Sequence, residues 1–303
     1  MAGKKKAPPP KPGRRHWGRR IVLALLAAGV GFAGWMHLNA RIVHVRYAEV
    51  RLGDLPASFD GTRVLFVSDV DLCGVNTANT NENLFRRLQS LQPDLLLLGG
   101  DYAAPTVLQM LNGRTGDDLT DARMAFFQSI AGFQAPLGKL AVSGDHDGDR
   151  ENLRLAALSC GVTLIDGDAA IISNGSDAIA VAGAVSGDVS ALARRFQRDQ
   201  CVIALTHSPA QAVEVRICEA SDGGAWADLT LSGHTHGGQL QVAGHSVLEL
   251  TEADRRYLSG WFADGPAPLL VTSGAGCEGA NFRLGTQAEV WLITLRARPG
   301  MEQ

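Results

Sequence analysis

Residues 63–71 read RVLFVSDVD, an apolar run of strand length that ends in a turn carrying two aspartates. Four later stretches repeat this arrangement: DLLLLGGD (94–101), LGKLAVSGDHD (137–147), VIALTH (202–207) and LTLSGHTH (229–236). Short apolar runs bounded by turn residues are typical of buried strands. Helical patterns at residues 79–91, 121–133 and 150–158 follow the early runs. Strands that alternate with helices predict an α/β fold.

The second half of the chain is richer in short strand patterns. We expect strands at residues 163–165, 170–173, 178–181, 239–242, 269–272 and 289–295. This distribution favours two sheets packed face to face within one domain. No internal repeat or second linker interrupts it, so we assign residues 60–298 to this domain and residues 41–59 to a juxtamembrane link and first strand.

The N-terminal 40 residues have a different composition. Residues 1–20 hold eight basic side chains, four prolines and no acid, which predicts a disordered tail. Residues 21–40 (IVLALLAAGVGFAGWMHLNA) contain no charged side chain and are long enough to span a hydrocarbon core. A cleaved signal peptide is the alternative, but the cleavage signal is poor and the apolar run is long for one. We therefore expect a single transmembrane anchor.

The distribution of charge bears on both topology and partners. The basic residues before the apolar run place the N-terminus in the cytoplasm and the domain outside, which we expect to mean a single-pass protein of the cell inner membrane. Eight of the 28 basic residues lie in residues 1–20, so residues 21–303 carry 20 basic against 31 acidic side chains, a net charge of −11. Such a body repels phosphate backbones, and we expect no nucleic-acid partner. The five cysteines are too few for a disulfide framework.

Metal-ligand side chains gather at the turns after the predicted strands. Ligands of open α/β sheets bind beyond the carboxyl ends of strands, and four of the five histidines after residue 50 lie at such turns. The candidate site residues are Asp69, Asp71, Asp101, Asp145, His146, Asp147, His207, His234 and His236. Carboxylates with imidazoles are the ligand set of first-row divalent metals. Seven of these residues, all except His146 and Asp147, are candidate metal ligands. Seven ligands suit two ions that share a carboxylate, an arrangement that activates water for phosphoryl displacement.

The order of these motifs resembles the calcineurin-like metallophosphoesterase superfamily over about residues 60–297. That family shows Asp-x-His, Gly-Asp, Gly-Asn-His-Asp/Glu, His and Gly-His-x-His, each after a strand. The stretch SGHTHGGQ (232–239), with YLSGW (257–261) and the tail at 272–295, is similar to its membrane-anchored bacterial branch. The resemblance implies a four-layer α/β/β/α sandwich and a phosphodiesterase or phosphatase that uses a dinuclear, metal-activated water. Phosphoesters of lipids or envelope precursors are the implied substrates near the membrane.

The resemblance also implies roles for individual residues. Asp69, Asp71 and His236 would hold the first metal, and Asp101 would bridge both. Asp145, His207 and His234 would hold the second. His146 would be the acid or charge stabiliser near the leaving group, and Asp147 would orient it. Arg283 is either a substrate contact or, as we favour, a surface arginine.

Two positions depart from the family pattern, because Asp71 replaces a histidine and Asp145 replaces an asparagine. Four carboxylates nearly neutralise two divalent ions and favour hard ions, so we expect Mn²⁺, with Fe or Zn²⁺ as alternatives. The first ion would be loosely held or absent if the shorter Asp71 fails to reach it. The residues leave a second hypothesis open: a catalytically impaired relative that binds a phosphate ligand or a partner.

Overall fold

Two six-stranded sheets form the centre of the molecule. The computed structural model describes residues 14–73, 76–113, 119–247 and 250–298. The first sheet has the strand order β1 (Val43–Leu52), β14 (Ala288–Ala297), β2 (Arg63–Val67), β3 (Leu95–Leu98), β4 (Gly138–Ala141) and β5 (Thr163–Leu164). The second has the order β12 (Gly260–Phe262), β13 (Leu269–Val271), β9 (Leu229–Ser232), β8 (Val202–Leu205), β7 (Asp177–Gly183) and β6 (Ala169–Asn174).

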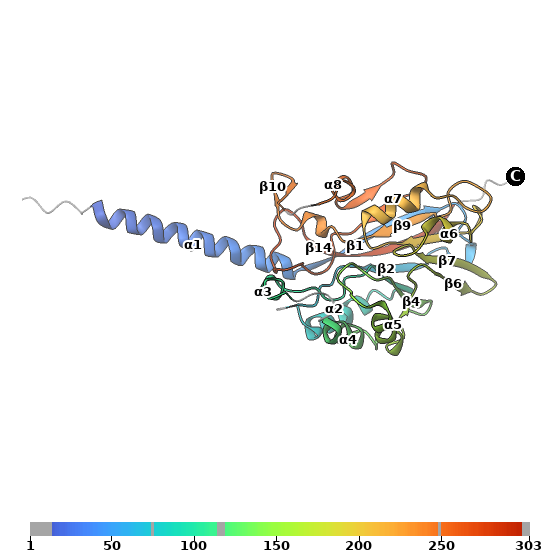
Figure 1. Ribbon diagram of the computed structural model, residues 1–303, viewed down its shortest axis with the longest axis horizontal. Helices are drawn as coiled ribbons and strands as arrows, with labels where there is room; N and C mark the ends of the chain where they lie inside the picture. The colour runs from blue at the N-terminus through green and yellow to red at the C-terminus, as the bar shows by residue number, and fades with distance from the viewer. Residues whose placement is uncertain (1–13, 74–75, 114–118, 248–249, 299–303) are drawn as a thin grey trace, which may run out of the picture.

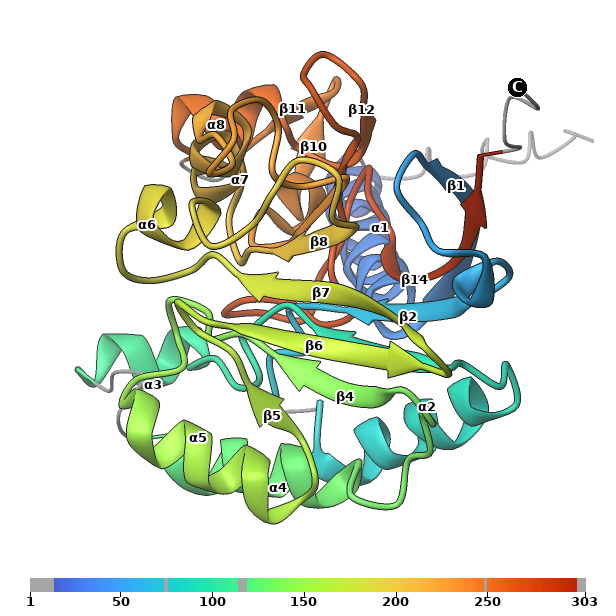
Figure 2. The ribbon, with the colours of Figure 1, turned by 90° about the vertical axis from the view of Figure 1, so that its right-hand side faces the viewer.

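Helices cover the outer face of each sheet, which gives the predicted four-layer α/β/β/α sandwich (Figure 2). The first sheet is covered by α2 (Ala78–Gln89), α4 (Thr120–Ser129) and α5 (Arg150–Ser159). The second is covered by α6 (Val189–Ala193), α7 (Pro209–Ile217) and α8 (Glu252–Arg256). Buried apolar side chains of both sheets, such as Phe66 and Ile203, fill the space between them. Strands buried on both faces explain the continuous apolar runs in the sequence.

Strand direction places the candidate site. In the first sheet β2, β3, β4 and β5 run parallel, as do β7, β8, β9 and β13 in the second. Their carboxyl ends therefore bring the turns after several strands together. The exceptions lie near the sheet edges. In the first sheet β1 pairs in parallel with β14, from Val43 opposite Ala288 to Leu52 opposite Ala297, and β14 runs antiparallel to β2. In the second sheet the edge strands β12 and β6 run antiparallel to β13 and β7.

The N-terminal helix α1 (Arg14–Arg41) projects away from the sandwich (Figure 1). Its segment Trp17–Arg41 is long and apolar enough to cross a membrane, and most of its side chains are exposed, unlike those of a core helix. The prediction of disorder over residues 1–20 is wrong for residues 14–20, which are helical. The helix begins two residues after Pro12, and the apolar run that follows lets the helix extend back into the basic segment. Residues 1–13 of that predicted tail lie outside the described residues.

The structure differs from the remaining expectations mainly in short elements. The pattern at 239–242 forms β10 (Gln241–Val242), which pairs only with β11 (His245–Ser246) in a hairpin outside both sheets. Ala243 and Gly244 both have positive φ, the backbone of a tight two-residue turn. The short helices α3 (Val107–Leu111), α6, α7 and α8, and the turns η1 (Ala57–Phe59) and η3 (His236–Gly238), were not expected from periodicity.

Candidate metal centre

All nine candidate site residues lie in turns at one end of the two sheets. Asp69 and Asp71 follow β2, Asp101 follows β3, and Asp145, His146 and Asp147 follow β4. His207 follows β8, while His234 and His236 follow β9. Residues from both sheets thus meet at the seam between them.

Four of these residues form a compact ligand cluster. Ligand atoms of Asp101, Asp145, His207 and His234 all lie within 4.8 Å of one another. This is the set that the sequence assigned to the second metal, with Asp101 as the bridging carboxylate. Two carboxylates and two imidazoles at this spacing can hold one divalent ion.

Asp145 joins both imidazoles of the cluster. Its Oδ1 lies 2.7 Å from His207 Nε2 and 3.1 Å from His234 Nδ1. Burial alone would raise the pKa of Asp145, but the hydrogen bonds from the two histidines outweigh it, so the pKa falls below its usual range. The Asp145 side chain is 53% exposed, which makes it the ligand most open to a substrate.

His207 is held in one orientation by the backbone. Its Nδ1 lies 2.8 Å from the Gly99 carbonyl oxygen, so Nδ1 carries the proton that this hydrogen bond requires. Nε2 then faces Asp145, and also lies 3.4 Å from Asp101 Oδ2. A backbone acceptor behind an imidazole is the usual way in which proteins orient a metal-ligating histidine.

The residues assigned to the first metal are buried beside this cluster. Asp69 and Asp71 have no exposed surface, and His236 Nε2 lies 3.5 Å from Asp71 Oδ2. Within the described residues these three do not form a second group as compact as the first. Burial, together with Asp101 and Asp69, raises the pKa of Asp71, and burial raises that of Asp69 to about 6. Burial and the nearby Arg283 charge lower the pKa of His236, which keeps its imidazole neutral.

Strained backbone marks the same turns. Eight non-glycine residues of the described chain have positive φ, and five of them are predicted ligands: Asp69, Asp71, Asp101, His234 and His236. Such strain persists where surrounding structure enforces it, and it concentrates at functional sites. Close packing enforces it here, because a Cβ on Gly144 would lie 2.1 Å from Asp101 Oδ1.

His146 lies at the rim of the cluster, and its acidic neighbour is Glu278. His146 Nε2 is 3.4 Å from Glu278 Oε1 and 3.8 Å from Asp145 Oδ2. The hydrogen bond to Glu278 raises the pKa of His146 to about 9, so the imidazole carries a proton at neutral pH. A protonated imidazole here can act as a general acid. The sequence analysis missed Glu278; its only signal was an acid within the glycine-rich tail segment GCEG (276–279).

Asp147 has a different task from the one expected. Its carboxylate accepts hydrogen bonds from the backbone amides of Asp101, Tyr102 and Gly144, at 2.9, 3.0 and 2.8 Å. It therefore holds the turns after β3 and β4 together, and within the described structure no hydrogen bond joins it to the His146 ring. Burial raises the pKa of Asp147 to about 7.

The donor set fits divalent metal ions. Both oxygens of Asp71 and Nδ1 of His236 are buried without a hydrogen-bond partner in the described structure. Unpartnered buried carboxylate oxygens are costly unless a cation neutralises them. The described ion pairs of the cluster involve only histidines, with no lysine or arginine. Metal ions would supply the missing positive charge.

A comparison with known families agrees with this chemistry. The model of the calcineurin-like phosphoesterase family matches residues 62–238, which is more than half of the chain. The chain belongs to this family. It is therefore a phosphoester hydrolase with a metal-binding site.

Relatives of this phosphoesterase resemble it along most of its length. The metallophosphoesterase YkuE of Bacillus subtilis is 23% identical over 91% of this chain and 94% of its own. Phosphodiesterase YaeI of Escherichia coli is 26% identical over 90% of this chain and 95% of its own. A Bos taurus transmembrane protein with a metallophosphoesterase domain is 26% identical over 84% of this chain, which covers 57% of the relative.

Arg283 of the phosphoesterase lies in the interior and not at the surface. It is fully buried, and its guanidinium donates hydrogen bonds to carbonyl oxygens of His236, Ser273, Gly274, Gly276 and Gln287. The preference for a surface arginine was wrong, because a single sequence does not reveal several inward-facing carbonyls of a loop. Arg283 fixes the loops that carry His236 and Glu278, and its backbone N–H contacts the Met36 carbonyl of α1 at 3.3 Å.

Proposed function

We propose that this chain hydrolyses phosphodiesters at a dinuclear metal centre held close to a membrane surface. The observation that carries the proposal is the cluster of Asp101, Asp145, His207 and His234. We assign these residues to one ion, and Asp69, Asp71 and His236, with Asp101 shared, to the other. Bound divalent ions would supply Lewis-acid charge stabilisation and nucleophile activation. Four carboxylate ligands favour Mn²⁺, with Fe or Zn²⁺ as alternatives.

The chain's own residues would do the remaining work. His146, held by Glu278, donates a proton to the leaving oxygen of the substrate. His207 donates its Nδ1 proton in a hydrogen bond to the Gly99 carbonyl oxygen, which leaves Nε2 free to bind a metal. Asp147 fixes the turns of Asp101 and Gly144, so it is a positioning residue.

The location of the enzyme is part of the proposal. We infer that α1 anchors it in the inner membrane with the basic N-terminus in the cytoplasm and the catalytic domain outside. The length and exposure of α1 support the anchor, and the name of the bovine relative agrees with it. An active site beside a membrane favours lipid-linked or envelope-precursor phosphoesters as substrates, and the name of YaeI favours diesters.

The test is metal content together with turnover of the full chain in detergent. Two Mn²⁺ per chain and hydrolysis of a chromogenic phosphodiester are expected for the unmodified protein. Asp101→Asn should abolish turnover and lower metal content. Asp199→Asn should change neither, because Asp199 is exposed and precedes β8, at the opposite end of that strand from His207. No turnover with Mn²⁺, Fe or Zn²⁺ on diesters or monoesters would favour the impaired relative that binds a phosphate ligand.

A further inference from the structure

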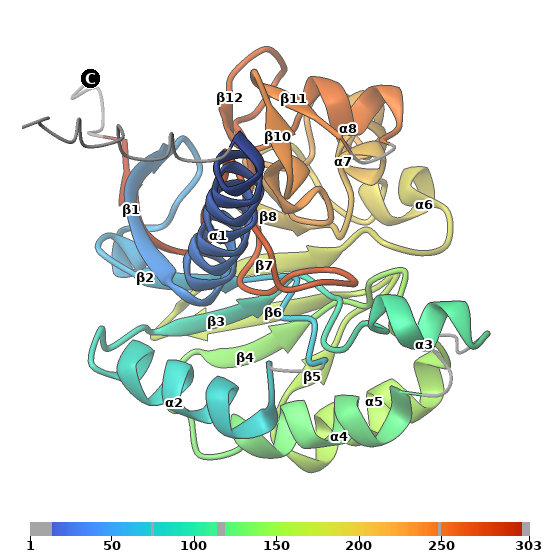
Figure 3. The ribbon, with the colours of Figure 1, turned by 90° about the vertical axis from the view of Figure 1, so that its left-hand side faces the viewer.

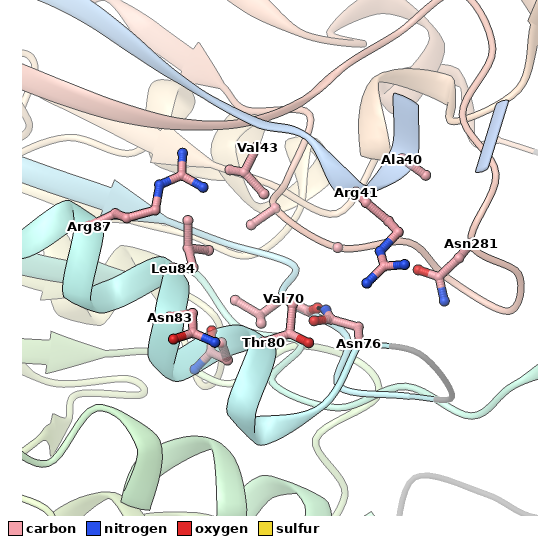
Figure 4. Close-up of a pocket in the computed structure, with 13 residues that line it drawn as sticks. Ala40, Arg41, Val43, Val70, Asn76, Thr80, Asn83, Leu84, Arg87 and Asn281 are labelled. Atoms are coloured by element: carbon pink, nitrogen blue, oxygen red, sulfur yellow. Dashed lines mark hydrogen bonds between the residues drawn. The ribbon is translucent and has the colours of Figure 1, made fainter. Parts of the chain in front are cut away.

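A cavity of about 280 Å³ opens where α1 meets the sandwich (Figure 4). It lies between the end of α1, the start of β1 and the first turns of α2. Figure 4 shows Arg41 and Asn281 toward one end and Arg87 toward the other, with Val43 and Leu84 between them. None of the nine candidate site residues lines this cavity, although Val70, which stands between Asp69 and Asp71 in the chain, does.

The charge of the cavity is entirely positive. Arg41 and Arg87 are among its 13 lining residues, which include no aspartate or glutamate. Both arginines are exposed, and among the described residues neither guanidinium group has a hydrogen bond or ion pair, although the Arg87 backbone carbonyl accepts from Ser90. By contrast, the neighbouring Arg86 pairs with Glu82 at 2.8 Å. Two unpaired guanidinium groups at one cavity of an acidic body are suited to a phosphate.

The other lining groups indicate that the ligand is larger than a phosphate ion. Asn81 lines the cavity, is 1% exposed and has an amide oxygen without a hydrogen-bond partner in the described structure. That oxygen can accept a hydrogen bond from a hydroxyl group. Val43, Val70 and Leu84 add apolar walls. A phosphate, a hydroxyl group and an apolar part together describe a phospholipid such as phosphatidylglycerol.

The position of α1 places the cavity at the depth of lipid head groups. A hydrocarbon core takes about 20 helical residues, so an apolar run at residues 21–40 brings Arg41 to the head-group layer. The end of α1 is fixed to the domain, because His37 Nδ1 lies 3.0 Å from the Asn281 carbonyl oxygen and Asn39 Nδ2 donates to Thr286 O at 3.2 Å. Figure 3, seen from the α1 side, shows α2 on the same face of the domain as the root of α1.

We propose that this cavity binds the head group of an anionic phospholipid from the leaflet that the domain faces. The inference rests on the proposed membrane anchor and is independent of catalysis. The head-group phosphate would lie between the two guanidinium groups, which Arg41 extends from one end of the cavity and Arg87 from the other. Asn81 accepts from the head-group hydroxyl. A bound lipid would hold the domain at one orientation to the membrane, with the metal centre at a constant height above it.

The test measures lipid binding to the full chain in detergent by native mass spectrometry. Short-chain phosphatidylglycerol, short-chain phosphatidylcholine and inorganic phosphate are titrated separately. Phosphatidylglycerol should bind in preference to both. Each guanidinium near a phosphate contributes about fivefold in affinity, so Arg41→Gln and Arg87→Gln should each weaken it by about that factor.

The matched control is Arg86→Gln, which removes one positive charge from the position of α2 just before Arg87. Its affinity for phosphatidylglycerol should equal that of the unmodified chain. Equal losses in Arg86→Gln and Arg87→Gln, equal binding of the two lipids, or binding of free phosphate as tight as that of the lipid would each overturn the proposal. Hydrolysis of a soluble chromogenic diester should be unchanged in Arg41→Gln and Arg87→Gln, which separates this site from failure of the metal centre.

Discussion

Nε2 of His207 lies 2.7 Å from Oδ1 of Asp145, so the turns after β8 and β4 are joined directly across the two sheets. The carboxylate of Asp145 stands where the family pattern has an asparagine amide. In either case an oxygen faces the imidazole, which explains how the replacement preserves the geometry of the cluster. The additional negative charge is the property that differs.

The first prediction separates that oxygen from its charge. Asp145→Asn keeps an oxygen that can bind a metal and accept from His207, so Mn²⁺ content and turnover should stay within about tenfold of the unmodified enzyme. Asp145→Ala removes the oxygen and should lower metal affinity by at least about 10-fold, the loss that follows even when only a residue supporting a ligand is removed. Metal analysis after dialysis against a chelator, together with kcat/KM, measures both. Identical behaviour of the two variants would contradict the assignment of Asp145 as a ligand.

The second prediction concerns the other departure from the family pattern. Asp71→His replaces a hard oxygen ligand by an imidazole nitrogen beside His236, so the metal preference should shift from Mn²⁺ toward Zn²⁺. Competition between the two ions at equal concentrations measures the ratio. Asp71→Asn is the control for lost charge and should bind fewer ions in total. An unchanged ratio in Asp71→His would show that Asp71 does not ligate a metal.

The third prediction concerns the buried Arg283. Arg283→Lys retains the charge but cannot reach the five carbonyl oxygens at once, so several would lose their donor. Each unsatisfied buried group costs about 1–3 kcal/mol, and the free energy of unfolding should fall by at least about 3 kcal/mol. Thermal unfolding measures this, with the exposed Arg256→Lys as the matched control. Equal melting temperatures for the two variants would show that Arg283 does not stabilise the loops that carry His236 and Glu278.

The fourth prediction concerns pH and Asp228, which lies outside the metal centre. Burial raises the pKa of Asp228 from 3.8 to about 6, so folding favours its protonated form. Its contribution to stability is complete below pH 3.8 and is lost as the pH rises through about 6. Asp228→Asn keeps an acceptor for the Val202 amide, which Asp228 Oδ2 binds at 2.8 Å.

Unfolding by urea between pH 4 and 7 measures the effect of Asp228, with the pH limits set by its two pKa values. The stability advantage of Asp228→Asn over the unmodified chain should grow as the pH rises. The difference between the two curves removes contributions from the metal-site carboxylates, which both chains share. If the two chains differed in free energy of unfolding by the same amount at every pH, burial would not raise the pKa of Asp228.

The apolar runs predicted two packed sheets with metal-ligand side chains at their strand ends, because both features depend on local patterns. Apolar runs mark strands buried on both faces, and the residue after each run lies at a strand end. The contacts of Asp147, Glu278 and Arg283 could not be predicted in this way. They depend on loops that lie far apart in the chain: Asp147 meets the amide of Asp101, and Glu278 meets His146. The residues that follow a single strand do not reveal which distant loop their side chains will contact.

The position of β14 between β1 and β2 has a consequence for the order of folding. The first two strands of the domain have no ladder with each other and pair only through the last strand, residues 288–297. Until that segment has been synthesised, β1 has no partner and β2 exposes an unpaired edge. Pairing across such a sequence distance makes sheet completion a late and slow event. We therefore expect the nascent chain to be most prone to aggregation before β14 is available to pair.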